Sequence, residues 1–597
     1  MPITIKNTAG GGVTLDSTTS ANETVNLPTG GGNLITTTGA TFTGNIATKG
    51  ISAVTAGTSN FVAGVNAGNS ITSGGNYNTV VGDEAGTAIT TGDHNTAVGY
   101  SSLVANTTGG QNTASGFKAM FSNTTGEDNT ATGYQALYAN TTGASNAAYG
   151  LFALSANTTA SNNTAVGHSS LKANTTGAEN IAVGEGSLTS NTTGAQNTAV
   201  GRKALELNTT GNYNVAIGQR TLDSNTTGGE NTASGYQALN ANTTGTANVA
   251  MGYKALRLNT TASNNVAIGP TSLYDNTTGA DNVAIGKSAL ANNTTASNNT
   301  AVGRSALDAN TTGSNNTSVG MESLISNTTG TEHAALGFQA LKSNTTGHSS
   351  VAVGNEALEH NTTASNNTAV GTKSLRANTT GTSNTAVGYQ AGVSVTTGAE
   401  NTYIGLQAGN DGTTGNNNTA VGSAAGIGLT TGGNNTLLGN DAGRSGSPGG
   451  EVNNENHKIC IGDENVDGAH IQVDWTVASD QRDKTDFTAL DLGLDFVKAL
   501  APVTYKWDKR SKYGDKTAEG YDLNAQTPDG THKEDWLDIG FKAQEVEALE
   551  IAAGYNKSNS TNLISSHTSD GKQMGLQYSK FVPILVKALQ ELSTQNT

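Results

Sequence analysis

The sequence has little of what fills the core of an ordinary globular protein. Aromatic residues make up 5% and charged residues 13% of its 597 residues, whereas 77 are glycine. A conventional core needs more Leu, Ile, Val and Phe than this chain offers for its length. The mean hydropathy and low charge density do not match a disordered chain either. The composition therefore predicts a repetitive architecture in which small units bury their apolar residues by stacking.

Features that would indicate other classes of protein are also missing. A single cysteine, Cys460, excludes an internal disulfide framework. No apolar run approaches the roughly 18–20 residues that span a bilayer. The net charge of −16 disfavours binding to nucleic acid or to an anionic membrane surface. Residues 1–7 lack the basic and apolar segments of a secretion signal, so we expect synthesis in a cytoplasm. The missing apolar run and the negative net charge lead us to expect no membrane insertion and no nucleic-acid partner.

The sequence has instead a regular repeat of 17 residues. The pentad Asn-Thr-Ala-Val-Gly and its variants begin at Asn78 and recur in phase to Asn435, which is 357 residues, or 21 steps of 17, and hence 22 copies. The consensus reads N-T-A-V-G-x-x-A-L-x-x-N-T-T-G-x-x, and its positions are numbered here from 1 to 17. Such a period predicts a β-solenoid or β-roll, with corners at Gly and at Asn-Thr-Thr-Gly where positive φ is expected.

One repeat cannot be stable alone. Ordering each of its residues costs about 1–2 kcal/mol in backbone entropy. Two or three buried aliphatic side chains supply roughly 1.5–3 kcal/mol each. Backbone ladders, Asn and Thr side-chain ladders and burial between chains must supply the difference. We therefore predict a symmetric homotrimer in which the Leu row (position 9) or the Val row (position 4) faces the shared axis.

The repeat also bears on the length and the ends of this shaft. If each repeat is one coil, strands about 4.8 Å apart give a shaft of roughly 100 Å, whereas a triple spiral would be more than twice as long. The copy at Asn78 and the four from Asn384 replace Ala-Leu with Ala-Gly, which is typical of capping repeats, with receptor contact as the alternative.

The N-x-[ST] triplets of the repeat are interpreted as corner residues rather than glycosylation sites. An ice-binding face would need a consistent Thr-x-Thr strand, which the repeat lacks.

The repeat resembles the Asn-x-Val-Ala-Ile-Gly head repeats of trimeric autotransporter adhesins and the repeated shafts of phage fibres, although its period is longer than in the adhesin heads. Residues 1–60 are rich in Gly, Thr and Asn. Within them, LPTGGGNLITTT at 27–38 resembles a module found near the start of phage tail-fibre proteins. That resemblance implies attachment of residues 1–60 to tail or baseplate proteins of a virion, with a generic leader as the alternative. Residues 61–77 then form a transition to the shaft at 78–451.

After Gly439 the period breaks and the composition changes. All three tryptophans lie beyond residue 470, and nearly half of the 30 basic residues fall in 479–597. The last of three helical patterns is amphipathic, with Pro583 in its first turn, where proline is tolerated. We predict a compact α+β domain at 479–597, preceded by a β tip or connector at 452–478. The helical patterns are residues 490–500, 543–549 and 581–592.

The connector contains a partial match to a calcium loop. Asp463, Asn465 and Asp467, with Asp474 at the twelfth position, have part of the expected spacing. The last ligand is Asp rather than Glu, however, and no helices flank the loop. Two strands around a turn, at 458–462 and 469–473, are the better interpretation. We expect no metal site and no cofactor.

The C-terminal region also resembles a known family. SDQRDK at 479–484, followed by GFKAQEV at 540–546 and by residues 578–592, is similar to the intramolecular chaperone of endosialidase tailspikes, a domain that also occurs in some phage tail fibres. The resemblance spans 479–597 in the expected order. It implies a helical trimer at the tip of a fibre, which holds the strands in register and then cuts itself off. The polar stretch at 508–535 occupies the place of the β-hairpin arms that grip the fibre in relatives.

Ser479 and Lys484 are the candidate catalytic residues of this cleavage. A serine hydroxyl needs a base, and a lysine serves as one only when neutral, which burial favours. Trimer assembly is one way to bury Lys484. The Ser–Lys dyad would cut once, on a side of Ser479 that the sequence does not specify. Asp480 and Arg482 match the family pattern and are expected to shape the turn, whereas Asp483 stands where relatives often carry an apolar residue. The alternative is that Ser479 only caps a helix.

Together the resemblances imply a homotrimeric fibre of a virion tail, assembled in a host bacterium's cytoplasm, that binds a bacterial polysaccharide or outer-membrane protein. Its only enzymatic activity would be single-turnover autoproteolysis. One alternative is a polysaccharide-degrading tailspike with an active site between subunits. That enzyme would need paired carboxylates, and acidic residues in the repeats look scattered and out of phase. A bacterial trimeric adhesin is the other alternative, which the absence of a recognisable secretion signal and membrane anchor disfavours.

Overall fold

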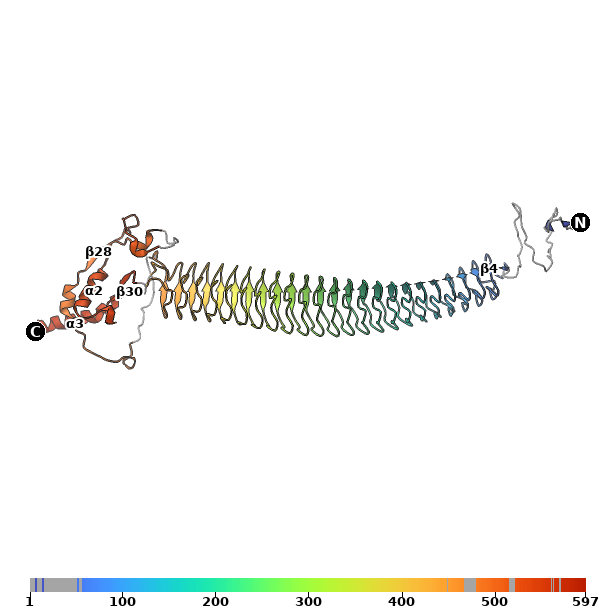
Figure 1. Ribbon diagram of the computed structural model, residues 1–597, viewed down its shortest axis with the longest axis horizontal. Coiled ribbons are helices and arrows are strands. Elements are labelled where there is room, and N and C mark those ends of the chain that lie inside the picture. The colour runs from blue at the N-terminus through green and yellow to red at the C-terminus, as the bar shows by residue number, and fades with distance from the viewer. Residues whose placement is uncertain are drawn as a thin grey trace.

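The computed structural model describes residues 6–7, 13–14, 51–52, 56–447, 449–466, 479–514, 521–559, 561, 563–568 and 571–596. As predicted, the protein is mainly β: a long solenoid is followed by a smaller part with helices and short strands (Figure 1). Near the N-terminus, β1 (Lys6–Asn7) pairs antiparallel with β2 (Val13–Thr14). The motif at 27–38 and the strand expected at 469–473 lie outside the described residues.

The shaft is a ladder of parallel strands of three residues, each at positions 2–4 of its repeat. Each residue pairs with the one 17 positions later, as Thr198 does with Val215 and Ala199 with Ala216. Each repeat is therefore one coil, which decides against the triple spiral and gives roughly 100 Å for the 22 repeats at about 4.8 Å per strand. The coils stack in single file along the long axis and curve gently (Figure 1).

The strands of this ladder are β4 (Phe61–Ala63), β5 (Thr79–Val81), β6 (Thr96–Val98), β7 (Thr113–Ser115), β8 (Thr130–Thr132), β9 (Ala147–Tyr149), β10 (Thr164–Val166), β11 (Ile181–Val183), β12 (Thr198–Val200), β13 (Val215–Ile217), β14 (Thr232–Ser234), β15 (Val249–Met251), β16 (Val266–Ile268), β17 (Val283–Ile285), β18 (Thr300–Val302), β19 (Thr317–Val319), β20 (Ala334–Leu336), β21 (Val351–Val353), β22 (Thr368–Val370), β23 (Thr385–Val387), β24 (Thr402–Ile404), β25 (Thr419–Val421), β26 (Thr436–Leu438) and β27 (Ile459–Ile461).

The ladder continues beyond the 22 repeats at both ends. At the N-terminal end, β4 pairs with the first repeat strand, β5, and β3 (Ile51–Ser52) pairs antiparallel with β4. Residues 61–77 thus form a coil of the shaft. At the other end, β27 pairs in parallel with β26, so that Thr436 lies opposite Ile459. The last coil is therefore longer than the others.

Each coil encloses its own apolar core. Every leucine at position 9, from Leu103 to Leu375, has an exposed fraction of 0%, and it packs with small residues at positions 3 and 8, such as Ala216 and Ala204. The prediction that the Leu row faces an axis shared between chains is therefore wrong. The alternative named with it, the row at position 4, does point outward, and Ile217 in that row is 46% exposed.

Two rows of buried asparagines form the polar part of this interior. At position 1, Asn231 donates from its backbone N–H to Oδ1 of Asn214 (3.1 Å) and from Nδ2 to the carbonyl of Gly245 (3.0 Å). At position 12, Nδ2 of Asn242 donates to Oδ1 of Asn225 (2.9 Å) and to Gly245 (3.0 Å). The first corner threonine likewise donates its hydroxyl hydrogen to its counterpart's carbonyl one coil later. These ladders satisfy buried backbone groups that a small aliphatic core cannot.

The corners use positive φ, as predicted, but only some of the predicted glycines adopt it. Gly218 at position 5 has φ of 129°, as predicted, whereas Gly228 at position 15 is not in the positive region. Glycine is needed at position 15 for space, because a Cβ on Gly228 would lie 2.4 Å from the carbonyl oxygen of Gly245 and 2.6 Å from Oδ1 of Asn225. The left-handed residues are instead non-glycine residues at positions 7, 9 and 17, such as Leu222 (52°).

The atypical end copies keep the interior filled in another way. Where glycine replaces the leucine of position 9, a larger residue enters from position 3 or 12. Tyr403, at position 3 and 1% exposed, packs between two such glycines. A Cβ on Gly392 or Gly409 would lie 2.8 Å or 2.3 Å from its ring carbons. The row of position-12 asparagines stops at Asn378, whose buried Oδ1 has no hydrogen-bond partner among the described residues.

The position-1 row is interrupted at two consecutive copies, by His333 and Ser350. His333 is buried, accepts the backbone N–H of Ser350 at Nδ1 (3.3 Å) and donates from Nε2 to the carbonyl of Gly347 (2.6 Å). Only a neutral imidazole can do both. Burial, with a smaller contribution from the nearby His348, lowers the pKa of His333.

We expect His333 to make the shaft sensitive to acid. Its folded-state pKa lies below the ordinary value of about 6.5, so as the pH falls below that value the unfolded chain binds a proton that the folded chain does not, and stability decreases. The His333→Asn variant gives this copy the usual asparagine and should lack this part of the acid response, about 1 kcal/mol per unit of pKa difference. Thermal unfolding followed by circular dichroism between about pH 5 and 8 measures this; the same acid response in variant and wild type would contradict it.

The C-terminal part has the predicted α+β character. The helices α1 (Leu494–Ala499), α2 (Ala543–Ala552) and α3 (Phe581–Gln595) overlap the three predicted segments. Two antiparallel pairs accompany them, β28 (Val503–Tyr505) with β29 (Asp538–Gly540), and β30 (Ser565–His567) with β31 (Met574–Leu576). Short 3-10 turns complete the unit: η1 (Gln481–Asp483), η2 (Arg510–Lys512), η3 (Leu523–Ala525), η4 (Lys557–Asn559) and η5 (Tyr578–Lys580). Every described helix is too short or too polar to cross a bilayer.

Buried side chains hold these elements together. Phe496 of α1, Val546 of α2 and Ile584 of α3 belong to one apolar core. The carboxylate of Glu591 in α3 accepts the backbone N–H of Leu494 (2.7 Å), at the start of α1, which begins four residues after the start of the predicted segment. This hydrogen bond lowers the pKa of Glu591. Buried Glu550 accepts three successive backbone N–H groups, of residues 563–565, at 2.6–2.8 Å.

The excursion between β28 and β29 reaches the end of the shaft. Its described residues, 506–514 and 521–537, form η2 and η3 rather than paired strands. Lys509 in this excursion donates from Nζ to the carbonyl of Glu464, just after the last strand of the ladder (2.9 Å). The expected hairpin arms are therefore not seen as strands in this part of the chain, although the excursion lies where it can contact the shaft.

Candidate functional site

The candidate residues lie where the chain enters the C-terminal domain. The turn η1 begins two residues after Ser479, and Asp480 is its N-cap, because Oδ1 of Asp480 accepts the backbone N–H of Arg482 (2.9 Å). The capping role considered for Ser479 is thus filled by Asp480. Ser479 keeps its hydroxyl for another contact.

That contact is with Lys484. Its Nζ lies 2.5 Å from Oγ of Ser479 and 3.4 Å from the carbonyl oxygen of the same residue. The single turn between them brings the two side chains together across five residues. A general base must be within hydrogen-bond reach of the proton that it removes, and this pair meets that requirement. The catalytic roles of Ser479 and Lys484 stay a prediction.

Asp480 and Arg482 form a second pair within the same turn. Arg482 donates from Nη2 to Oδ2 of Asp480 (2.5 Å) and from Nε to both carboxylate oxygens (3.1 Å each). These hydrogen bonds lower the pKa of Asp480 and raise the pKa of Arg482. Because Asp480 is engaged by Arg482, its carboxylate does not draw Lys484 away from Ser479.

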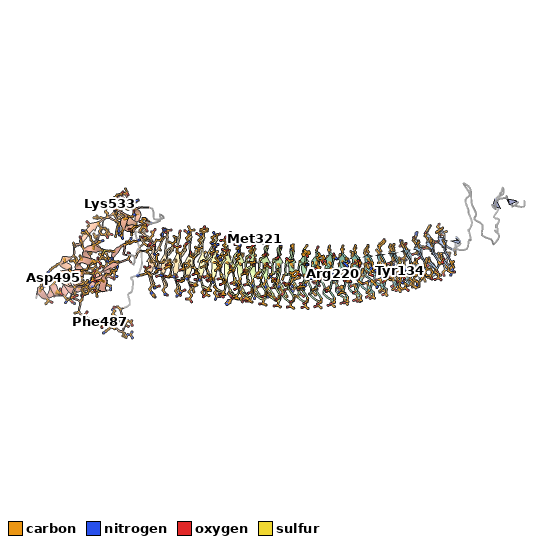
Figure 2. All side chains as sticks on the ribbon, viewed as in Figure 1. Tyr134, Arg220, Met321, Phe487, Asp495 and Lys533 are labelled. Atoms are coloured by element: carbon orange, nitrogen blue, oxygen red, sulfur yellow. The ribbon has the colours of Figure 1, made fainter. Side chains whose placement is uncertain are left out.

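The whole segment is open in the single chain. Residues 479–489 are exposed, including the aromatic ring of Phe487, which is 66% exposed. Figure 2 shows Phe487 on a loop at the outer edge of the C-terminal part, away from its core. A lysine acts as a base only in its neutral form, which burial or a neighbouring cation favours. Among the described residues no part of the same chain covers the dyad.

The described part of the connector, up to residue 466, shows only part of the calcium motif. Within the described stretches of the chain, no group of three or more His, Cys, Asp or Glu side chains is arranged to hold a metal ion. In the partial calcium motif, Asp463 accepts from the backbone N–H (2.9 Å) and from Nδ2 (2.8 Å) of Asn465. The remaining positions of that motif, 467–474, lie outside the described residues.

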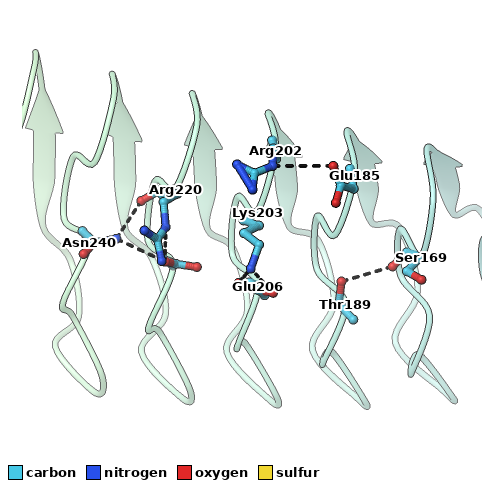
Figure 3. A network of polar contacts seen from close by, with 9 residues as sticks. Ser169, Glu185, Thr189, Arg202, Lys203, Glu206, Arg220 and Asn240 are labelled. Atoms are coloured by element: carbon cyan, nitrogen blue, oxygen red, sulfur yellow. Dashed lines mark hydrogen bonds and ion pairs between the residues drawn. The ribbon is translucent and has the colours of Figure 1, made fainter.

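Several charged residues on the shaft form ion pairs within and between coils (Figure 3). Glu206 and Asp223 are both at position 10 of adjacent coils, so the view that acidic residues are out of phase is wrong for this pair. Burial, and then a shared hydrogen bond with Glu206, raises the pKa of Asp223. Lys203 lies 3.0 Å from Glu206, and Arg220 lies 3.0 Å from Asp223. Each of these carboxylates is thus paired with its own cation, whereas the two carboxyl groups of a glycosidase flank the bond that they cleave.

A surface on α3 was not recognised from the sequence. The helix was expected to be amphipathic, and it buries Phe581, Ile584 and Ala588. It also exposes a second apolar stripe, which has the a and d spacing of a coiled coil, with two residue pairs seven apart. The α3 stripe consists of Val582, Leu585, Val586, Leu589 and Leu592. The seven-residue spacing in the sequence could have indicated this stripe. Only the packing of α3 in the domain shows that these side chains are exposed to solvent.

The fold defines a β-solenoid protein with a small C-terminal α+β domain. That domain is a chaperone of endosialidase domain, because residues 479–555 match the family so described. The match starts at Ser479 and ends just after α2, so it does not extend to β30, β31 and α3. No curated protein and no solved structure matches the chain. A long β-solenoid followed by this domain is consistent with a phage tail fibre or tailspike.

Proposed function

We propose that this protein is a homotrimeric phage tail fibre that attaches a virion to a bacterial surface, and that its C-terminal domain directs trimer assembly and then removes itself by cleavage next to Ser479. The observation that carries the proposal is the junction. A solenoid of 22 repeats leads into a chaperone of endosialidase domain whose first matched residue, Ser479, has the amine of Lys484 at 2.5 Å from its hydroxyl.

Trimer assembly is supported by the α3 stripe. Leu589 is 66% exposed and Val582 is 59% exposed, although both are apolar. Exposed apolar stripes with heptad spacing are typical of helices that pack against other helices. Three copies of α3, packed through this stripe, would remove it from water at the end of the fibre.

Assembly would also make the dyad competent. Packing of neighbouring chains over residues 479–489 would exclude water and favour the neutral form of Lys484. The hydroxyl oxygen of Ser479 then attacks an adjacent peptide carbonyl while its proton passes to Lys484. The peptide C–N bond breaks, Lys484 gives the proton to the leaving amine, and water hydrolyses the resulting ester. Each chain is cut once. Coupling the cut to burial by partners would ensure that the chaperone leaves only after the strands are aligned.

The proposal places the shaft on the virion tail, attached through residues 1–60, after assembly in the host's cytoplasm. Electrophoresis of purified virions should show chains that lack the C-terminal domain, about the last 119 residues. Intact chains in mature virions would contradict the release step. A receptor on the bacterium, a polysaccharide or an outer-membrane protein, would be bound by the remaining shaft.

Attachment without degradation separates this function from that of a polysaccharide-degrading tailspike. The released shaft, incubated with capsular polysaccharide from the bacterium that it binds, should produce no new reducing ends. A growing reducing-end signal would establish the tailspike, with its active site between subunits.

A further inference from the structure

The outward face of the shaft's sheet is uncharged along its whole length. In all 22 repeats, positions 2 and 4 hold Thr, Ser, Ala, Val, Ile, Leu, Met or Tyr, whereas every charged residue of the repeats lies at position 6, 7, 10, 11, 16 or 17. Positions 2 and 4 flank the buried residue of each strand, so they form the outer surface of the sheet. This surface, positions 2 and 4 of β5–β26, is called the sheet face below.

The sheet face is accessible, and its position-4 row is apolar in 19 of the 22 copies, whereas position 2 is threonine in 14 of them. At position 4 the apolar side chains are half-buried or exposed in every copy, as in Ile217, Ile268 and Ile285. The strands pair in register, so equivalent side chains form straight rows. At about 4.8 Å per strand and about 3.3 Å per residue, 22 strands of three residues cover roughly 1,000 Å². A stable interface buries about 800 Å² per partner, so this uncharged surface, with its row of apolar side chains at position 4, is large enough for one.

We infer that the sheet face is the surface through which the shaft packs against other copies of this chain. The inference rests on the proposed trimer and assigns its contact. A sugar ligand fits the neighbouring aromatic rings poorly, because Tyr100 and Phe117 stack on each other (centroids 5.5 Å apart, planes at 16°), as do Phe117 and Tyr134 (5.0 Å, 8°). Phe117 therefore has another ring on each of its faces, where a sugar would otherwise stack.

The repetition of this face explains why the fibre needs a chaperone. The rows are nearly the same in every coil, so chains displaced by one repeat lose only one of 22 coil contacts. The sheet face therefore supplies affinity but almost no register. Register must be imposed from one end, by the C-terminal domain. Once all coils are matched, the long contact holds the chains together after that domain has left.

Substitutions on the sheet face test this assignment. Ile217→Lys with Ile268→Lys places charges in the contact, and Thr227→Lys with Thr278→Lys places the same charges in the same two coils at position 14, which is exposed. Each pair is made in the full-length chain. Light scattering then gives the mass of the shaft after release of residues 479–597, and circular dichroism confirms that it is folded.

We expect trimers for the wild type and the position-14 variant, and at least a tenfold loss of self-association for the sheet-face variant. Equal association of both variants would overturn the assignment of the sheet face as the contact, but not the proposal of a trimer. A wild-type shaft that is monomeric both before and after cleavage would overturn the proposed trimer itself. The two failures are thus distinguishable.

Discussion

Replacing Ser479 with alanine should leave one full-length chain on a denaturing gel, where the wild type yields two fragments. The variant lacks the hydroxyl that lies 2.5 Å from Nζ of Lys484, and without a nucleophile the cut should slow by on the order of 1,000-fold or more. Lys484→Arg is the sharper companion, because it keeps the positive charge but cannot become a neutral base. Both variants should assemble and remain uncut.

Gln481→Ala is the matched control, since Gln481 lies in η1 between the two residues and is exposed. It should be cut like the wild type. Intact mass measurement of the two wild-type fragments also determines on which side of Ser479 the bond is broken. Continued cleavage of Ser479→Ala at the wild-type position would show that another residue is the nucleophile.

The sequence allowed the coil to be predicted because a 17-residue period directly reflects in-register stacking. It did not show which way the side chains point. Leu222 looked as suitable for an axis between chains as for the inside of one coil. The outcome depends on Asn225 and its counterparts, which hydrogen-bond to one another and to the corner carbonyl inside the coil. Because these hydrogen bonds satisfy the polar groups inside the coil, the coil can close around its own leucines. The amino-acid composition alone does not show this.

The candidate site was predictable to a similar degree. The spacing of Ser479 and Lys484, with the family resemblance, was enough to select the pair that the turn brings together. The sequence could not show that Asp480 provides the cap, because Ser and Asp are equally good capping residues. Nor could it show that residues 479–489 are uncovered in one chain. Exposure depends on how distant parts of the chain pack, which the sequence of this segment does not encode locally.

Replacing Leu589 with aspartate should abolish both assembly and cleavage. Leu589 is the most exposed member of the α3 stripe, so the domain itself should fold, which circular dichroism can confirm. Burying an unpaired carboxylate in a helix contact is strongly unfavourable, and we expect association to weaken by on the order of 100-fold or more. Gln590→Asp, one residue further along α3 and exposed, is the matched control and should assemble and be cut.

The two readouts separate the causes. Ser479→Ala should form trimers that are not cut, as judged by light scattering and gel, whereas Leu589→Asp should give no defined trimer, only single chains or shafts associated out of register, and should not be cut. The uncut Leu589→Asp chain is the decisive result, because its dyad is chemically intact and only the covering by partners is missing. If Leu589→Asp were monomeric and still cut at the wild-type rate, Lys484 would not depend on burial by other chains. The link between assembly and release would then be wrong.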